Sequence, residues 1–155
     1  MIDFLTDEEI KFINEYSLKI TNEEKNYNLD NANDLNFLMN FVEEEFKDPY
    51  KISLAYCVSI IVLHPFRNGN HRTSILSAEH FLLKNNYESF TNDKKDTELE
   101  KWRIDYESKY DLEREFFRIT CIEDDEKRKE EIKKIIDSEY GKYIEKWLRD
   151  NYKKV

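Results

Sequence analysis

The sequence predicts an all-α protein, built as a helical bundle around one central buried helix. Apolar residues recur at helical spacing in most segments of the 155-residue chain. Only two glycines and two prolines are present, too few for the many tight turns of a β-rich fold. The longest uncharged run, residues 52–66, is mostly apolar, and its helical part belongs in the middle of a domain. A membrane-spanning helix needs about 20 apolar residues, so this shorter run is expected in the protein core.

The first half of the chain is predicted to contain four helices separated by polar segments. Thr6 and Glu9 have the spacing of a capping box, which marks the start of the first helix. The polar, Asn-rich residues 21–34 are expected to form a loop. Pro49 suits a first helical turn and therefore separates the second helix from the third. The expected helices cover about residues 7–20, 35–46, 50–63 and 70–86.

The second half is predicted to form three or four charged, amphipathic helices. Residues 91–155 carry 36 charged side chains, against 23 in residues 1–90. The first 90 residues therefore have the composition of a packed body, and the rest that of solvated helices attached to it. We expect a core at residues 1–90 and a charged helical extension at residues 91–155 packed on that core, within one domain overall.

Charge and cysteine content narrow the classes of partner and compartment. The formal net charge of −9 disfavours nucleic acid and anionic membranes as partners, because each phosphate contact needs Lys or Arg. The same charge disfavours a helix-turn-helix DNA-binding domain. The N-terminal residues lack the basic and apolar regions of a signal peptide. Cys57 and Cys121 alone do not make a disulfide framework, so we expect a reduced, cytoplasmic protein.

One nine-residue stretch, residues 64–72, combines three features that suit chemistry on a phosphate. It reads His-Pro-Phe-Arg-Asn-Gly-Asn-His-Arg. His64 can accept a proton near neutral pH, Gly69 allows a tight turn before a helix whose N–H groups bind an anion, and Arg72 can grip a phosphate. These features predict phosphoryl or nucleotidyl transfer to a hydroxyl. With two glycines the chain has no G-x-G-x-x-G or Walker loop, so this stretch is the candidate nucleotide site.

The stretch resembles the core motif of the Fic/Doc (Fido) family, H-x-F-x-[D/E/N]-[G/A]-N-x-R, which lies between two helices. The resemblance covers about residues 5–87, and the continuation Thr73-Ser74 and the short chain are closer to the Doc branch. It implies a Fido-like helical bundle and an enzyme that uses ATP to modify a hydroxyl side chain of a target protein. Members of the Fic branch generally transfer AMP, whereas the Doc branch transfers the γ-phosphoryl group.

The resemblance also implies roles for individual residues. His64 matches the base that deprotonates the target hydroxyl. Phe66 matches the buried aromatic residue that pins the loop, with Pro65 as its neighbour in the motif. Asn68 stands at the position where most active members bind Mg²⁺. The positions that match the anion hole and the phosphate-gripping arginine are Gly69, Asn70, His71 and Arg72.

Three positions depart from the family pattern and affect the expected chemistry. Asn68 replaces an Asp or Glu, so it would hold Mg²⁺ only weakly. His71 replaces a Gly or Lys, and Ile75 stands where many AMP-transferring members have a second Arg. The loss of that Arg favours Doc-like phosphoryl transfer over AMP transfer by the same site. The chain also lacks the family's self-inhibitory motif [S/T]-x-x-x-E-[G/N], so a separate antitoxin or inhibitory partner is expected.

The departures leave a second function class open, a catalytically weakened helical module that binds a partner protein. Single residues also have structural interpretations, in which His64 caps a helix end, Asn68 forms a turn and His80 lies on a helix flank. The three histidines lack the H-x-x-x-H spacing of a zinc site. In this family a flap aligns the target strand, and the resemblance places it within residues 21–34.

Overall fold

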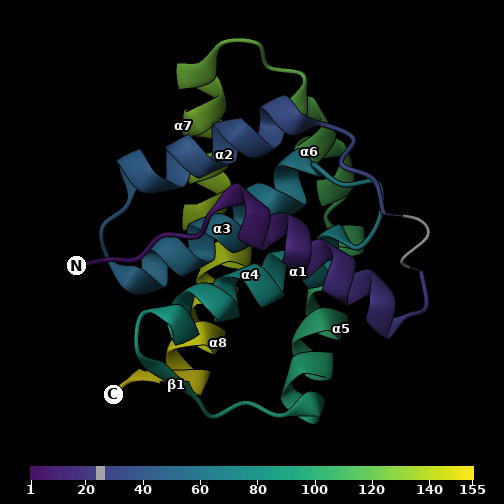
Figure 1. Ribbon diagram of the computed structural model, residues 1–155. Coiled ribbons are helices and arrows are strands. Elements are labelled where there is room, and N and C mark those ends of the chain that lie inside the picture. The colour runs from purple at the N-terminus through teal and green to yellow at the C-terminus, as the bar shows by residue number, and fades with distance from the viewer. Residues whose placement is uncertain (24–26) are drawn as a thin grey trace.

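Two helices that follow each other in the chain, at residues 49–63 and 70–84, pack on each other at the centre of the protein. The computed structural model describes residues 1–23 and 27–155, and in that part helices dominate, which confirms the all-α prediction. Figure 1 shows their arrangement. The helices are α1 (Asp7–Ile20), α2 (Ala32–Glu45), α3 (Pro49–Leu63), α4 (Asn70–Lys84), α5 (Asp93–Lys109), α6 (Leu112–Thr120), α7 (Asp125–Asp137) and α8 (Glu139–Asn151), and the short strands are β1 (Tyr87–Ser89) and β2 (Tyr152–Lys154).

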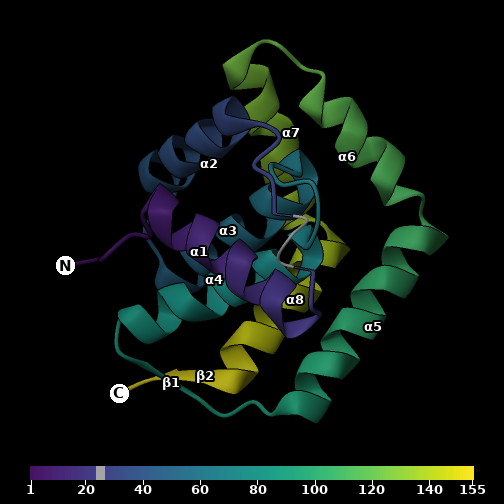
Figure 2. The ribbon, with the colours of Figure 1, turned by 45° about the vertical axis from the view of Figure 1, so that its right-hand side comes forward.

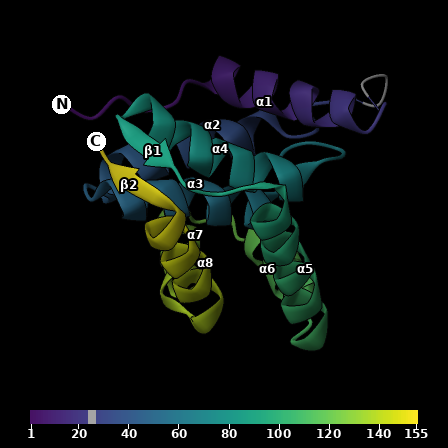
Figure 3. The same ribbon diagram turned by 90° about the horizontal axis from the view of Figure 1, so that it is seen from below.

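Helix α3 is the predicted central helix. Asp48 caps its start by accepting a hydrogen bond from the Lys51 N–H, and Pro49 occupies the first turn, where a missing N–H costs nothing. Every residue from Ile52 to Leu63 is buried. Because α3 has no polar face, other helices must cover it on every side. Helices α2, α4, α6, α7 and α8 all contact it. Figure 3 shows α1 on one side of α3 and α4 and the four later helices projecting from the other.

Two local features differ from the sequence expectation. Helix α2 begins at Ala32 rather than at residue 35, because the side chain of Asn31 accepts a hydrogen bond from the Asp34 N–H and caps the helix inside the expected loop. The sequence did not predict β1 and β2, which pair antiparallel with Tyr87 opposite Lys154. Each strand has three residues, too few for a periodic pattern to be recognised.

Residues 93–151 form four helices, and three of them, α6, α7 and α8, lie directly against α3. Figure 2 shows α5 and α6 as an arm beside the central helices. Trp102 of α5 stacks on Tyr143 of α8 with ring centroids 3.6 Å apart, which joins the arm to the last helix. In the part of the chain that the structure describes, no helix is both long and apolar enough to cross a membrane. The residues of this half that enter the common hydrophobic core are Leu99, Phe116, Ile119, Ile132, Ile136, Tyr140, Ile144, Leu148 and Tyr152.

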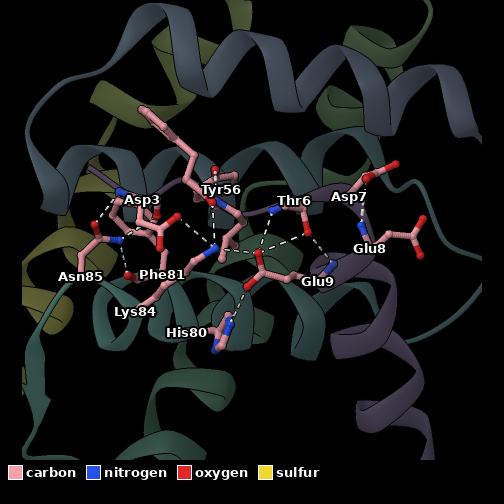
Figure 4. A network of polar contacts seen from close by, with 12 residues as sticks. Asp3, Thr6, Asp7, Glu8, Glu9, Tyr56, His80, Phe81, Lys84 and Asn85 are labelled. Carbon is pink, nitrogen blue, oxygen red and sulfur yellow. Dashed lines mark hydrogen bonds and ion pairs between the residues drawn. The ribbon is translucent and has the colours of Figure 1, made fainter. Parts of the chain in front are cut away.

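A polar network joins the start of α1 to the end of α4 (Figure 4). The predicted capping box forms, with the Glu9 N–H donating to Thr6 Oγ1 at 3.1 Å and the Thr6 N–H donating to Glu9 Oε1 at 3.0 Å. The Glu9 carboxylate also accepts from Lys84 Nζ at 2.7 Å and from His80 Nε2 at 3.0 Å. Partial burial opposes ionisation of Glu9, but the bonds from Lys84, Thr6 and His80 outweigh it and lower its pKa to about 2.

We predict that Glu9→Gln removes a pH-dependent contribution to stability of about 1 kcal/mol. The pKa of Glu9 is lowered from 4.5 to about 2 on folding, so its contribution is fully present above pH 4.5 and is lost as the pH falls toward 2. Urea unfolding should therefore separate variant from wild type at neutral pH, and the difference should shrink near pH 3. Glu8→Gln is the control, because Glu8 is an exposed carboxylate in the same turn. A difference that stays constant with pH would contradict the assignment.

Candidate active site

The motif begins where α3 ends, and the backbone there is strained. His64 is the C-terminal cap of α3 and lies in the left-handed region, with φ 53° and ψ 55°, while its N–H donates to the Ile60 carbonyl. This conformation is uncommon for a residue other than glycine and concentrates at functional sites. Pro65 and Phe66 then turn back into the core and are buried. The turn leaves the side chain of His64 exposed at the end of the most buried helix.

Asn70 holds this turn in place. Its Oδ1 accepts from the Phe66 N–H at 3.2 Å and its Nδ2 donates to the Phe66 carbonyl at 2.7 Å, so the amide brackets one residue of the loop. The same Nδ2 lies 3.2 Å from Nδ1 of His64. Asn70 is therefore buried and binds the loop rather than facing solvent, and it orients the imidazole of His64.

The backbone of residues 28–31 forms a short pairing with the backbone of the motif. The Arg67 N–H donates to the Asn28 carbonyl at 2.9 Å, and the Asn31 N–H donates to the Pro65 carbonyl at 3.0 Å, with Leu29 opposite Phe66. The flap expected within residues 21–34 falls partly on residues 24–26, which lie outside the described residues. Its described end is paired with the motif itself.

Gly69 starts α4 in a conformation that suits glycine. Its φ is +77°, and a Cβ there would lie 3.0 Å from Ser17 Oγ, so both the backbone and the close approach of α1 favour glycine. Asn14 of α1 supports the same turn by donating from Nδ2 to the Asn68 carbonyl at 2.9 Å. No side chain caps α4, so the N–H groups of its first turn remain available for an anion.

Arg72 lies on the α1 side of this helix end. Its Nη1 donates to the Ser17 carbonyl at 2.8 Å. Among the ion pairs found between described residues, none involves Arg72, so a neutral carbonyl holds the guanidinium without compensating its charge. This charge is next to the uncapped end of α4, and the two together attract an anion.

A cavity of about 920 Å³ opens on the opposite side of the motif, between the end of α3 and the arm of α5 and α6. His64 and His71 both line it, together with Glu107 and Glu113. The predicted site residues therefore divide into two groups. The two histidines face the cavity, whereas the Asn68 carbonyl, Gly69 and the Arg72 guanidinium contact α1.

The surroundings of His64 favour its neutral form. Although His64 as a whole is exposed, partial desolvation of its ring and the nearby ring of His71 lower the pKa of His64 below its usual 6.5, and the carboxylates of Glu113, Asp30 and Glu107 act in the opposite direction. A neutral imidazole can accept a proton on its unprotonated nitrogen, which the contact with the Asn70 Nδ2 donor identifies as Nδ1.

Sequence reasoning missed Glu107 and Arg103, which contact the motif, and Tyr140, which bonds to both of them. Glu107 Oε1 lies 2.6 Å from His71 Nε2, and the Tyr140 hydroxyl donates to Glu107 Oε2 at 2.6 Å. Arg103 is 1% exposed and donates to the His71 carbonyl, to Ser74 Oγ and to the Tyr140 hydroxyl. The one signal in the sequence is position, because Arg103 follows Leu99 by four residues and so shares the buried stripe of its helix.

The residues present do not form a Mg²⁺ site of their own. No three or more His, Cys, Asp or Glu side chains gather in a metal-binding arrangement anywhere in residues 1–23 and 27–155. The side chain of Asn68 offers one neutral amide oxygen, and the backbone carbonyl of Asn68 already accepts a hydrogen bond from Asn14. Mg²⁺ prefers carboxylates together with substrate phosphates and water. The donor set thus does not fit a resident ion, and a metal would depend on the phosphates of a bound nucleotide.

Comparison with known proteins agrees with the motif. The model of the Fic/DOC family matches residues 4–82, a segment that runs from the lead into α1 nearly to the end of α4. No curated protein and no solved structure is found to match the chain. The matched segment spans half of the chain and contains all of residues 64–72, with the His64 turn, the glycine-started helix and Arg72 in place. The chain therefore belongs to the Fic/DOC family.

Proposed function

We propose that this protein is a Fic-type transferase that uses ATP to modify a hydroxyl side chain of a target protein, with transfer of the γ-phosphoryl group as its main reaction. Family membership supports a transferase in general. The observation that carries the proposal is the junction of α3 and α4, where the neutral imidazole of His64 faces the cavity and the uncapped end of α4 follows within the same nine-residue stretch. The guanidinium of Arg72 lies on the α1 side of that helix end.

In the proposed step His64 accepts the proton of the target hydroxyl while the hydroxyl oxygen forms a bond to the γ-phosphorus. The bond from that phosphorus to the β,γ-bridging oxygen breaks, and ADP leaves with the electron pair. Catalysis of this kind rests on positioning and on charge stabilisation. The first N–H groups of α4 and the guanidinium of Arg72 supply the positive charge that stabilises the phosphates.

Ile75 favours the γ-phosphoryl reaction over its alternative, AMP transfer by the same site with pyrophosphate as the leaving group. At this position the side chain packs against the apolar core and offers no charge. An AMP-transfer pose would lack a charge-assisted bond of about 1.5–3 kcal/mol. The third candidate, a catalytically weakened partner-binding module, is favoured by the same neutral Ile75 together with Asn68.

The proposal also names the cellular compartment, the target, the regulator and the substrate. Cys57 and Cys121 are both free thiols, in keeping with a reducing, cytoplasmic compartment. The target is a protein with an accessible hydroxyl side chain, and an antitoxin or other inhibitory partner restrains the enzyme in trans. ATP is the substrate, and a Mg²⁺ ion would be held by its phosphates, with the Asn68 amide oxygen as one weak additional ligand.

His64→Ala is predicted to lower the rate of label transfer by about 10²–10⁴. His64 is exposed, so the melting temperature should stay within a few degrees of wild type. His80→Ala is the matched control, since His80 is also exposed and lies at the far end of α4. The lowered pKa of His64 places the acid limb of the rate below pH 6.5, because protonation removes the base. Full activity in His64→Ala would remove this residue from the mechanism.

Arg72→Ala should weaken ATP binding by about 10-fold to 150-fold, the loss expected for one charge-assisted phosphate contact. Isothermal titration of the His64→Ala background with ATP measures the affinity without turnover. Arg67→Ala serves as control, because Arg67 is an exposed arginine of the same loop that faces Asp30 at 3.7 Å. Equal affinities in the two variants would show that the phosphates bind elsewhere.

The transferred group is decided by ATP labelled at the α or the γ phosphorus, incubated with cell lysate and the enzyme. We expect a labelled protein band from γ-labelled ATP only. A band from α-labelled ATP would establish AMP transfer, and no band from either, with a stable partner complex, would establish the binding module.

Asn68→Asp adds a carboxylate and should lower the Mg²⁺ concentration needed for half-maximal activity. An unchanged requirement would show that residue 68 does not hold the ion.

A further inference from the structure

The first turn of α4 is held by a network of three side chains that lie beyond the family-matched residues 4–82, two of which bond to the turn directly. Arg103 and Glu107 come from α5, and Tyr140 comes from α8. The close backbone neighbours of α5 are α6 and α8, so these side chains provide its main link to the motif. They form a closed ring of hydrogen bonds around the backbone and the side chain of His71.

Arg103 holds the backbone of this turn. Its Nη1 donates to the His71 carbonyl at 3.3 Å and its Nη2 to Ser74 Oγ at 2.8 Å, while its Nε donates to the Tyr140 hydroxyl at 3.2 Å. The Ser74 hydroxyl in turn donates to the His71 carbonyl at 2.6 Å. A buried guanidinium is costly unless it is fully hydrogen-bonded, and here all three nitrogens are used.

Glu107 holds the ring of His71. Burial acts to raise the pKa of Glu107, but the contacts with His71, Tyr140 and Arg103 outweigh it and lower the pKa, so the carboxylate is ionised. An ionised carboxylate only accepts hydrogen bonds, which makes His71 Nε2 and the Tyr140 hydroxyl the donors. The ring nitrogen Nδ1 is left on the opposite side, and within the described residues it has no hydrogen-bond partner.

We propose that Glu107 and Arg103 are positioning residues of the active site. Glu107 fixes the tautomer and orientation of His71, and Arg103 fixes the carbonyl side of the same turn, so the phosphate-binding end of α4 is in shape before the nucleotide arrives. The inference rests on the proposed function. Donors that are already oriented need no reorganisation when charge develops, which is why such support increases catalytic efficiency.

A purely structural link between α5 and α4 would not need this chemistry. Apolar residues of similar volume usually replace a buried ionic group at little or no cost in stability. Here the charged groups are instead aimed at one motif residue, contacting both its carbonyl and its ring. His71 also lines the cavity that His64 lines, so its orientation bears directly on what binds there.

Glu107→Gln tests the proposal in the full chain, because it keeps the volume and removes the charge. We expect the KM for ATP to rise about tenfold with a smaller change in kcat. The effect should vanish in the His71→Ala background, since Glu107 then has nothing to orient. Glu100→Gln, an exposed carboxylate two turns earlier on α5, should leave both constants unchanged. An equal loss in both backgrounds would show that Glu107 acts on the fold alone and would overturn the proposal.

The imidazole of His71 gives a second readout, which does not depend on enzymatic turnover. In ¹⁵N-labelled wild type the nitrogen signals of His71 should show the Nε2-protonated form, and Glu107→Gln should give a mixture of tautomers. The opposite tautomer in wild type would overturn the proposal even if the variant fails to fold. ATP binding without label transfer would instead count against the proposed transferase, and the ring signals would still decide whether Glu107 orients His71.

Discussion

The apolar surface of α3 sets the constraint on which the other elements depend. Complete burial of a Val, Leu or Ile side chain is worth about 1.5–3 kcal/mol, so a helix without a polar face is stable only when every side is covered. Helices α2, α4, α6, α7 and α8 provide that cover. At the C-terminal end of α3 the chain becomes exposed, and His64 lies there in a left-handed backbone conformation. The most buried element thus carries the strained, exposed residue at its tip, and a rigid scaffold absorbs the strain.

The surroundings of the motif combine two kinds of support. Neutral groups form the inner side, where the Asn70 amide brackets Phe66 and the Asn14 amide holds the Asn68 carbonyl. Charged groups form the outer side, where Arg103 and Glu107 are buried together with Tyr140. The inner support comes from residues 4–82 and the outer support from later helices, so the charged second half supplies side chains that contact the motif.

The long periodic elements could be predicted from sequence, since α1 and α3 each carry a clear cap, α3 has an unbroken apolar run, and α4 starts directly after Gly69. The position of the motif followed from the same pattern. What escaped prediction depends on contacts between distant residues: the pairing of β1 with β2, and the burial of Arg103 inside a segment whose composition is that of a solvated helix. A single sequence shows the charge of Arg103 and not its partners, because Ser74 and Tyr140 lie 29 and 37 residues away.

The wide separation of these contacts bears on the order in which the protein folds. Helices α3 and α4 are neighbours in sequence and in space, whereas the Tyr50 hydroxyl reaches the carbonyl of Tyr152 across 102 residues. Contacts that close long loops form slowly because the loop entropy is lost before they reward it. By loop length, the contacts between α3 and α4 cost the least entropy, the hydrogen bonds around His71, which span 32 to 37 residues, cost more, and the contact of Tyr50 with Tyr152 costs the most. The first turn of α4 therefore depends on side chains from α5 and α8, and a chain cut after α4 would keep the whole motif sequence but lose the contacts that hold His71.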